Sequence, residues 1–212
     1  MANSGNLYAK GVVALLDGNI KLTSDNIKLA LVGSGYTPNL ATDQYWSTPQ
    51  VNEITTAGYT AGGSTLTGVS VTATTAASWT ISYPASGTPV SAGYLIKSGN
   101  YLYRAANSGT AAAAAPTFPT VEGETVADGN GVIWTNLGTA VVVFTATGGY
   151  SWASISTSGV PYGVIYDSTP GLAASDPLIA LLTFSPTLTN SPAGPVTINP
   201  DPALGYFAIP LF

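Results

Sequence analysis

The stretch KLALVGSGYTPNLATDQYWSTPQVNEITTAGYTAGGSTL, from Lys28 to Leu66, holds the clearest strand and turn signals of the chain. At its start Ile27, Leu29 and Leu31 occupy alternate positions, which predicts a strand with one face in a core and the other in water. The segment GSGYTPN then breaks this alternation, because glycine permits tight turns and proline fixes its own backbone. A second turn, GYTAGG, precedes the next apolar run. We therefore expect a buried strand, a loop and a turn.

The composition of the whole chain predicts an all-β protein. Its 212 residues include 24 Gly and 15 Pro, 45% are hydrophobic and only 7% are charged. Frequent Gly and Pro limit long helices, and many short runs of Val, Ile, Thr and Tyr favour strands. The length suffices for one sizeable core or for a domain with a small satellite. We expect an antiparallel β-sandwich or barrel-like main domain with a short N-terminal helix and a small inserted β domain.

Residues 7–17 are the best candidate for that helix. Tyr8, Val12 and Leu15 recur at helical spacing, and Gly18 can adopt the left-handed backbone that follows a helix end. The competing interpretation is a strand that turns at the Asp-Gly pair, since such pairs also begin hairpins. We prefer the helix.

Further strands are indicated by short apolar or alternating runs. The segment 178–184 is almost continuously apolar, which is typical of a strand buried on both faces. The C-terminal segment YFAIPLF is either a closing strand of a sheet or a patch that another subunit covers. The predicted strands are residues 66–71, 79–83, 141–146, 151–155, 160–166, 178–184, 196–198 and 206–212.

An inserted module is predicted at residues 87–138. The strand rhythm stops at Pro84 and resumes only at Val141, and the residues between them have their own turns and aromatic side chains. The main domain would then comprise residues 1–86 and 139–212. In so short a module, large side chains such as Tyr94, Tyr103, Phe118 and Trp134 are expected to fill the core.

The charge pattern argues against a nucleic-acid partner. The net charge is −5, and the five cationic residues form no basic stripe that could neutralise phosphates. The N-terminal segment has no cationic region before a short apolar run, so we expect neither a signal peptide nor a membrane helix.

The residue types needed for common catalytic chemistry are sparse. The chain has no His and no Cys, which removes the serine and cysteine triads and the usual zinc ligands. Glu122, Glu124 and Asp128 lie close together in sequence but do not follow the calcium-loop pattern. Solvation of a strand edge and a turn at Asp128 are the preferred interpretation, and Asp167 and Asp176 are expected to cap turns. We expect no enzyme, no catalytic residue, no metal and no cofactor.

The segments IKLALV, GYTPN, a Trp-bearing linker, NEI, GYTAGG and YGVIYDSTPGLAASDPLIALLTF follow one another along the chain. In this order they resemble a family of tailed-phage virion proteins, and the resemblance covers most of the chain outside residues 87–138. The resemblance implies a capsid decoration, or cement, protein on the outer surface of a bacteriophage virion, made in the host cytoplasm. It implies the major capsid protein and further copies of the chain as partners, with a homotrimer as the expected assembly.

The inserted segment has a distinctive set of aromatic, turn and proline residues: Tyr101, Tyr103, Ala105, Gly109, Thr110, Pro116, Phe118, Pro119, Thr120, Thr125, Val126, Asp128, Gly129 and Trp134. With these residues it is similar to a small β-module that recurs in phage tail, fibre and decoration proteins. An alternative function is therefore a tail or fibre component that binds host-surface glycans, and a carbohydrate-active protein is an alternative of another class.

Two groups of residues are candidates for contacts with partners. Loop aromatics and the apolar C-terminus can anchor an interface, although loop aromatics more often fold back over their own core. Exposed aromatics in the inserted module could stack on a sugar ring. The interface candidates are Tyr45, Trp46, Tyr206, Phe207, Ile209, Leu211 and Phe212, and the glycan-binding candidates are Tyr101, Tyr103 and Trp134.

Overall fold

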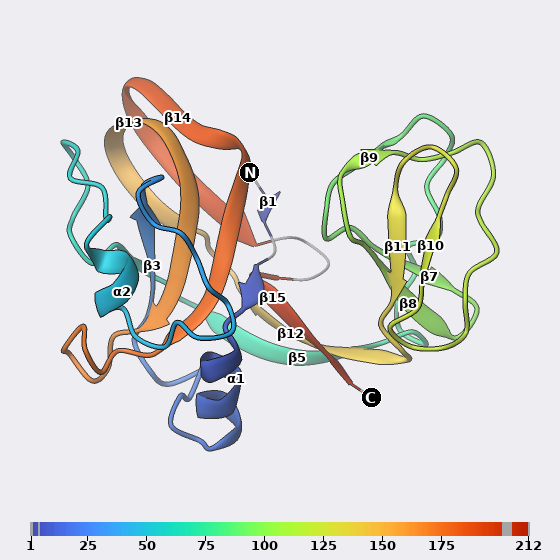
Figure 1. Cartoon of the computed structure of the whole chain (residues 1–212), viewed down its shortest axis with the longest axis horizontal. Coiled ribbons are helices and arrows are strands. Elements are labelled where there is room, and N and C mark those ends of the chain that lie inside the picture. The colour runs from blue at the N-terminus through green and yellow to red at the C-terminus, as the bar shows by residue number, and fades with distance from the viewer. Residues whose placement is uncertain (1, 4, 201–204, 212) are drawn as a thin grey trace. The chain divides into compact units, whose positions relative to one another are not determined.

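A computed structural model describes residues 2–3, 5–200 and 205–211, with the backbone alone at 2–3 and 210–211. Strands dominate the described chain, and its two helices are short, so the predicted all-β class with a short N-terminal helix is confirmed (Figure 1). The described residues form two compact units. The first contains residues 2–3, 5–70, 144–200 and 205–207, and the second contains residues 71–143 and 208–211.

The first unit is built on a six-stranded sheet in the order β1-β14-β13-β3-β4, with β2 also paired to β14. Only β1 runs parallel to its neighbour, and the other pairs are antiparallel. The strands are β1 (Ala2–Asn3), β2 (Asn6–Leu7), β3 (Ile27–Val32), β4 (Ser64–Thr65), β13 (Tyr150–Asp167) and β14 (Leu178–Pro200).

Strand β13 is central, because it pairs with β3 along one edge and with β14 along the other. Tyr162 is the partner of Val32 in β3 and of Thr183 in β14. The ladder with β14 continues far beyond this point, to Tyr150 opposite Ile198, with several register shifts. The predicted strand pair at 160–166 and 178–184 is therefore confirmed within longer strands.

The expectation that β3 has one face in water is wrong. Leu29 and Leu31 lie in one buried cluster, whereas Ala30 and Val32 lie in a second cluster, and all four side chains are fully buried. Burial on both faces follows from the position of β3 beside β13 within the sheet. Only Lys28 keeps partial contact with solvent.

The helix α1 (Ala9–Leu16) confirms the helical interpretation of the N-terminal segment. Its one buried residue, Gly11, lies so close to the start of β14 that a methyl group there would collide with the carbonyl of Leu178. Gly18 follows the helix with a positive φ of 72°, as expected for a residue just past a helix end. A second helix, α2 (Ser47–Gln50), is a single turn.

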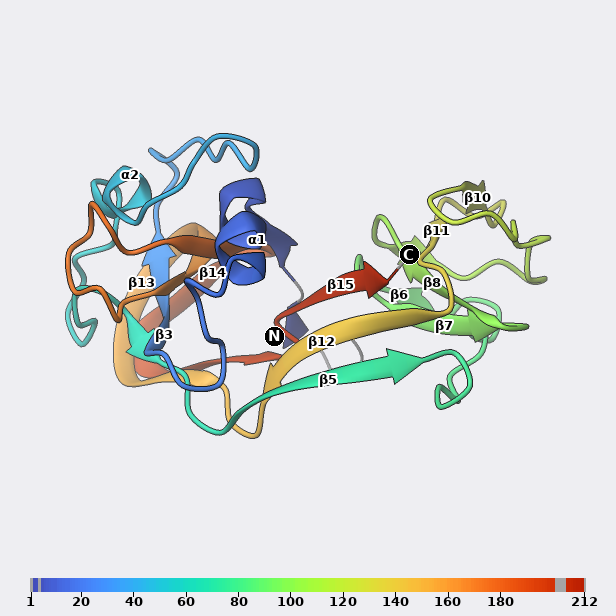
Figure 2. The ribbon, with the colours of Figure 1, turned by 90° about the horizontal axis from the view of Figure 1, so that it is seen from below.

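A three-stranded sheet has the order β15-β12-β5, and its strands are β5 (Val69–Thr75), β12 (Ala140–Ala146) and β15 (Phe207–Leu211). Figure 2 shows the three strands side by side. The C-terminal segment is therefore a closing strand. The predicted strand at 79–83 is wrong, because the N–H groups of Ser78 and Trp79 both donate to the Thr75 carbonyl in a turn that ends β5.

The second unit contains a four-stranded sheet in the order β10-β11-β8-β7 and a two-stranded sheet of β6 and β9. The predicted module at 87–138 lies inside this unit. A buried cluster joins module residues such as Leu102 and Leu137 to Ala76 and Val141, which lie outside it. The strands are β6 (Pro89–Val90), β7 (Leu95–Ser98), β8 (Tyr101–Ala105), β9 (Gly109–Thr110), β10 (Thr125–Ala127) and β11 (Ile133–Asn136).

Aromatic rings fill a second core of this unit. Phe118 packs against Tyr103 with ring centroids 4.5 Å apart, and it meets Tyr83 and Trp134 at larger angles. Trp134 is fully buried in the same cluster. The expected packing role of Tyr103, Phe118 and Trp134 is confirmed. Such edge-on and tilted contacts suit aromatic rings, whose faces and edges carry opposite partial charge.

Gly63 gives a direct test of how tightly the GYTAGG turn closes on β3. Its φ is +76°, and a Cβ there would collide with the backbone of Leu29. We expect Gly63→Ala to lower the free energy of unfolding by at least about 3 kcal/mol, because backbone strain and overpacking combine.

The matched control is Gly159→Ala in β13. Gly159 has a similar φ of +66°, but a methyl group added there would have no atom of the described chain within 4 Å. It should therefore lose only about 1 kcal/mol for the left-handed backbone. Urea unfolding of both variants, followed by circular dichroism, measures the difference. Equal losses would contradict the close approach at Gly63.

Candidate functional site

A cleft of about 320 Å³ opens beside Trp46 in the first unit. The Trp46 ring stacks on that of Tyr166, with centroids 4.6 Å apart and planes 7° apart. The Tyr166 hydroxyl donates a 2.7 Å hydrogen bond to the Gly62 carbonyl. Polar groups complete the lining, including Lys28 and Asp176. The lining of this cleft is mostly polar, because Trp46 and Tyr166 are each only 2% exposed and their stacked rings offer little surface to a ligand.

Trp46 itself is not an interface residue, and this prediction is wrong. The backbone N–H of Trp46 donates to the Asp176 carbonyl, and that of Ser47 donates to the Ala173 carbonyl. These bonds hold the loop against the β13–β14 connection, and only 2% of Trp46 is exposed. Its neighbour Tyr45 stays at the surface and remains a candidate for a contact.

The NEI and GYTAGG segments meet through the carboxylate of Glu53. The Tyr59 hydroxyl and the Gly62 N–H each donate a 2.6 Å hydrogen bond to Glu53 Oε1. The Tyr59 oxygen in turn accepts the N–H of Leu31 in β3. Burial raises the pKa of both Glu53 and Tyr59 above their ordinary values. No sequence pattern predicted this network, because its members are brought together only by the fold.

The GYTPN loop is fastened in a similar way. The Tyr8 and Tyr36 hydroxyl oxygens lie 3.0 Å apart, and Tyr36 donates a 2.7 Å hydrogen bond to Asp43. The same Asp43 oxygen accepts the Asn39 N–H at 2.9 Å. Burial raises the pKa of Tyr8 and of Tyr36 above the ordinary tyrosine value, at which a hydroxyl is already protonated at neutral pH. The tyrosines of the GYTAGG and GYTPN segments therefore stabilise the fold through their hydroxyl groups.

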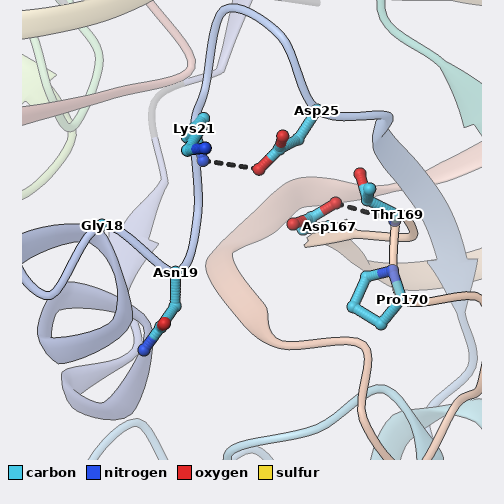
Figure 3. A pocket seen from close by; sticks show the side chains of 7 residues that line it. All are labelled: Gly18, Asn19, Lys21, Asp25, Asp167, Thr169 and Pro170. Carbon is cyan, nitrogen blue, oxygen red and sulfur yellow. Dashed lines mark hydrogen bonds between the residues drawn. The ribbon is translucent and has the colours of Figure 1, made fainter.

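A second cleft, of about 360 Å³, brings together two carboxylates from distant parts of the chain (Figure 3). Asp25 precedes β3 and accepts the Lys21 N–H, while Asp167 ends β13 and accepts the Thr169 N–H at 2.8 Å. The predicted turn-capping role of Asp167 is confirmed by this bond. The cleft is lined by Gly18, Asn19, Lys21, Asp25, Asp167, Thr169 and Pro170.

Asp167 carries an electrostatic penalty in this cleft. Burial raises its pKa above the ordinary value, and the neighbouring Asp25 carboxylate raises it further, whereas hydrogen bonds from Thr169 act in the opposite direction. Two nearby carboxylates can share a proton or bind a cation. Within the described residues, however, no group of three or more Asp, Glu, His or Cys side chains is arranged to hold a metal ion.

The acidic segment of the second unit has a different organisation. Asp128 is buried and accepts hydrogen bonds from the Tyr83 hydroxyl and from the N–H groups of Ala112, Asn130 and Val132. Burial acts to raise its pKa, but these four donors hold the pKa below its ordinary value. Asp128 thus ties loops together, and the preferred turn interpretation is confirmed by its bond to Asn130.

The glycan-binding candidates lie mostly inside the second unit. Tyr103 and Trp134 are buried, and the Tyr103 hydroxyl donates to the Pro119 carbonyl at 2.8 Å. Neither ring has a free face for a sugar, so their assignment as binding residues is wrong. Tyr101 is half-buried and keeps some exposed surface.

The structure also overturns part of the prediction for the C-terminal interface candidates. Tyr206 and Phe207 are buried within the chain's own core, where Phe207 stacks on Phe144 with centroids 4.7 Å apart. They therefore have no surface for a partner, and their assignment is wrong. Ile209 is half-buried, whereas the Leu211 side chain and Phe212 lie outside the described residues. The most exposed apolar side chains are others, including Leu16, Val51 and Leu172.

Comparisons with known proteins provide no relative of this chain. No family model, no curated protein and no solved structure matches it. In the described part of the chain, no helix has the length and apolar character needed to cross a membrane.

The Asp25–Asp167 cleft makes a prediction about the pH dependence of stability. A pKa that is raised on folding means that the stabilising contribution is complete below the unfolded pKa and is lost as pH rises through the folded value. We therefore expect Asp167→Asn, which keeps an acceptor for Thr169, to be more stable than the native chain at pH 7. The gain should be up to about 1 kcal/mol, because a neutral amide avoids the cost of burying a charge, and the hydrogen bonds from Thr169 already offset part of that cost.

Thermal unfolding of the two proteins between pH 3 and pH 7 measures this difference. The advantage of the variant should shrink as pH falls and the Asp167 carboxyl group becomes protonated. Asp17→Asn, at an exposed position after α1, serves as the control for a general charge effect. A variant that is less stable than the native chain at pH 7, or an equal gain from Asp17→Asn, would contradict the assigned cost of burying this charge.

Proposed function

We propose that this chain is a non-enzymatic structural protein of a tailed-phage virion, a capsid decoration protein on the outer head surface. The proposal rests first on the ordered segments that resemble such proteins. Two of these segments are far apart in sequence, yet IKLALV forms β3 and YGVIYDSTPGLAASDPLIALLTF forms the facing parts of β13 and β14. The resemblance therefore falls on strands that pair with one another, which supports a shared fold.

The contacts made by the loops of the resembling segments support the same proposal. Glu53 of the NEI segment binds Tyr59 and Gly62 of the GYTAGG segment, and Asp43 binds Tyr36 of the GYTPN loop. These residues stabilise a framework, and their function in this proposal is to present a surface. The observation that carries the proposal is that the segments which resemble virion proteins also contact one another in the structure.

The mechanism in this proposal is the burial of surface area. A protein that straddles neighbouring capsid subunits adds contacts that must break before the shell can expand or rupture. With only 7% charged residues, such contacts would depend on hydroxyl, amide, backbone and apolar groups, and they would change little with salt. The proposed partners are the major capsid protein and further copies of this chain, with a homotrimer as the expected assembly.

A tail or fibre location is the second candidate. It is favoured by the similarity of residues 87–138 to a module found in such proteins, and by the half-buried Tyr101 at the start of β8. In that case the second unit would contact glycans on the host surface. A carbohydrate-active protein is the candidate of another class, which a cleft with exposed aromatic and acidic side chains would favour.

Immunogold electron microscopy of the virions of the phage that encodes this chain tests the location. We expect an antibody against the purified protein to label the head surface, and the label should disappear after adsorption of the antibody with the same protein. Label confined to the tail would favour the fibre alternative. Absence of the chain from purified virions by mass spectrometry would refute a virion protein of either kind.

A further inference from the structure

Strand β5 has an unpaired edge. It is the last strand in the order β15-β12-β5, and among the described residues no strand pairs with its other side. Its exposure is unusual as well, since Val71, Thr72 and Ala73 are all exposed and Val71 retains 39% of its surface. A strand segment that is exposed on both faces and along one edge offers unpaired backbone groups to another strand.

Two backbone hydrogen bonds fix which residues of β5 point toward that open edge. The Thr147 N–H donates to the Gly68 carbonyl, and the Ala76 N–H donates to the Thr139 carbonyl. The two bonds are equally far apart along both strands, so the antiparallel ladder between them contains no bulge. Since bonding direction alternates along a strand, the even-numbered residues face β12. Residues 69, 71, 73 and 75 therefore direct their N–H and C=O groups outward.

Thr75 confirms this alternation and is itself unavailable to a partner. Its carbonyl accepts the N–H groups of Ser78 and Trp79, at 3.0 and 3.1 Å, and its N–H donates to the Ser78 hydroxyl at 3.2 Å. All three bonds lie on the side away from β12. The outward groups that no described residue uses are those of Val69, Val71 and Ala73.

The open edge of β5 lacks the usual devices that prevent strand addition. Its sequence, VSVTATT, contains no charge and no proline, and the ladder with β12 is regular. The opposite edge of the same sheet, β15, contains a proline, which removes one N–H donor. The four-stranded sheet ends at one side in β7, which contains Lys97, and at the other in the three-residue β10.

We propose that β5 pairs with β5 of a second copy of this chain, antiparallel and centred on Val71. In this register Val71 lies opposite Val71 of the other copy, and Val69 lies opposite Ala73. Each of the three outward residues then exchanges both backbone hydrogen bonds, which no register centred on a neighbouring residue achieves. The two exposed valine side chains become a cross-strand pair, which β-branched residues favour.

The chemistry of the edge favours a second copy over an unrelated strand. The free groups of β5 are symmetric about Val71, so the strand is complementary to itself, and the absence of charge means that two copies do not repel each other. A pair of strands this short buries less area than a standard stable interface. The contact is therefore expected to be weak in solution and to strengthen where copies are held close together. The contact is twofold and joins copies in pairs, so it is separate from the threefold contacts of the expected homotrimer and does not depend on the proposed virion role.

Single cysteines test this register, because the native chain has no cysteine. Opposed residues of a hydrogen-bonded antiparallel pair have Cα atoms about 5.5 Å apart, which suits a disulfide. We expect Val71→Cys to form a covalent dimer under mild copper-catalysed air oxidation. Ala73→Cys is the matched control, since its copies would lie roughly 14 Å apart along the pair, and it should cross-link at least tenfold less.

A proline at residue 73 tests the hydrogen bonding itself. The Ala73 N–H points away from β12, so Ala73→Pro removes no bond within the chain but blocks a bond to the second copy. In the Val71→Cys background it should reduce the covalent dimer at least tenfold, with an unchanged circular dichroism spectrum. If that spectrum changes, the Ala73→Lys variant is used in place of Ala73→Pro, because a charge on the edge also opposes pairing. Equal cross-linking at 71 and 73, none at 71, or cross-linking that neither Pro nor Lys reduces would overturn the proposal.

Discussion

The antiparallel pairing of β13 with both β3 and β14 is the interaction on which the first unit depends. It joins the chain before residue 33 to the chain after residue 149, so local contacts alone cannot form it. Leu29 and Leu31 enter one core from β3, while Ala30 and Val32 enter another. Both faces of the sheet are therefore dry at its centre, and the backbone groups there must be satisfied by the ladder. The loops of the recognised segments are then fixed onto this ladder.

Half-buried or buried carboxylates hold the loops of the described structure in place by hydrogen bonds. Glu53 accepts hydrogen bonds from the Tyr59 hydroxyl and the Gly62 N–H, and Asp43 accepts one from the Tyr36 hydroxyl. In the second unit, Asp128 accepts hydrogen bonds from several loops, including one from the Tyr83 hydroxyl. Each carboxylate accepts several donors at once, and such charge-assisted hydrogen bonds are stronger than neutral ones. This arrangement lets a chain with few charges use those charges inside the fold.

Sequence periodicity predicted the elements whose signals are local. The helix at α1, the strand pair at 160–166 and 178–184, and the packing of Phe118 all follow from spacing and composition. The burial of Trp46, Tyr206 and Phe207 did not, because an aromatic residue in a loop or near a chain end gives no sign of which surface it will cover. The Asp25–Asp167 cleft was missed for the same reason, since its two carboxylates become neighbours only when β3 pairs with β13.

If the first unit depends on the β3–β13–β14 ladder, this ladder must also be its most stable part. Native-state amide hydrogen exchange, resolved by residue, measures this most directly. We expect that amides in the ladder of β3 and residues 162–166 of β13 exchange only through global unfolding, and that those of α1 exchange faster through local opening. Ladder amides that exchange as fast as those of α1 would contradict this dependence.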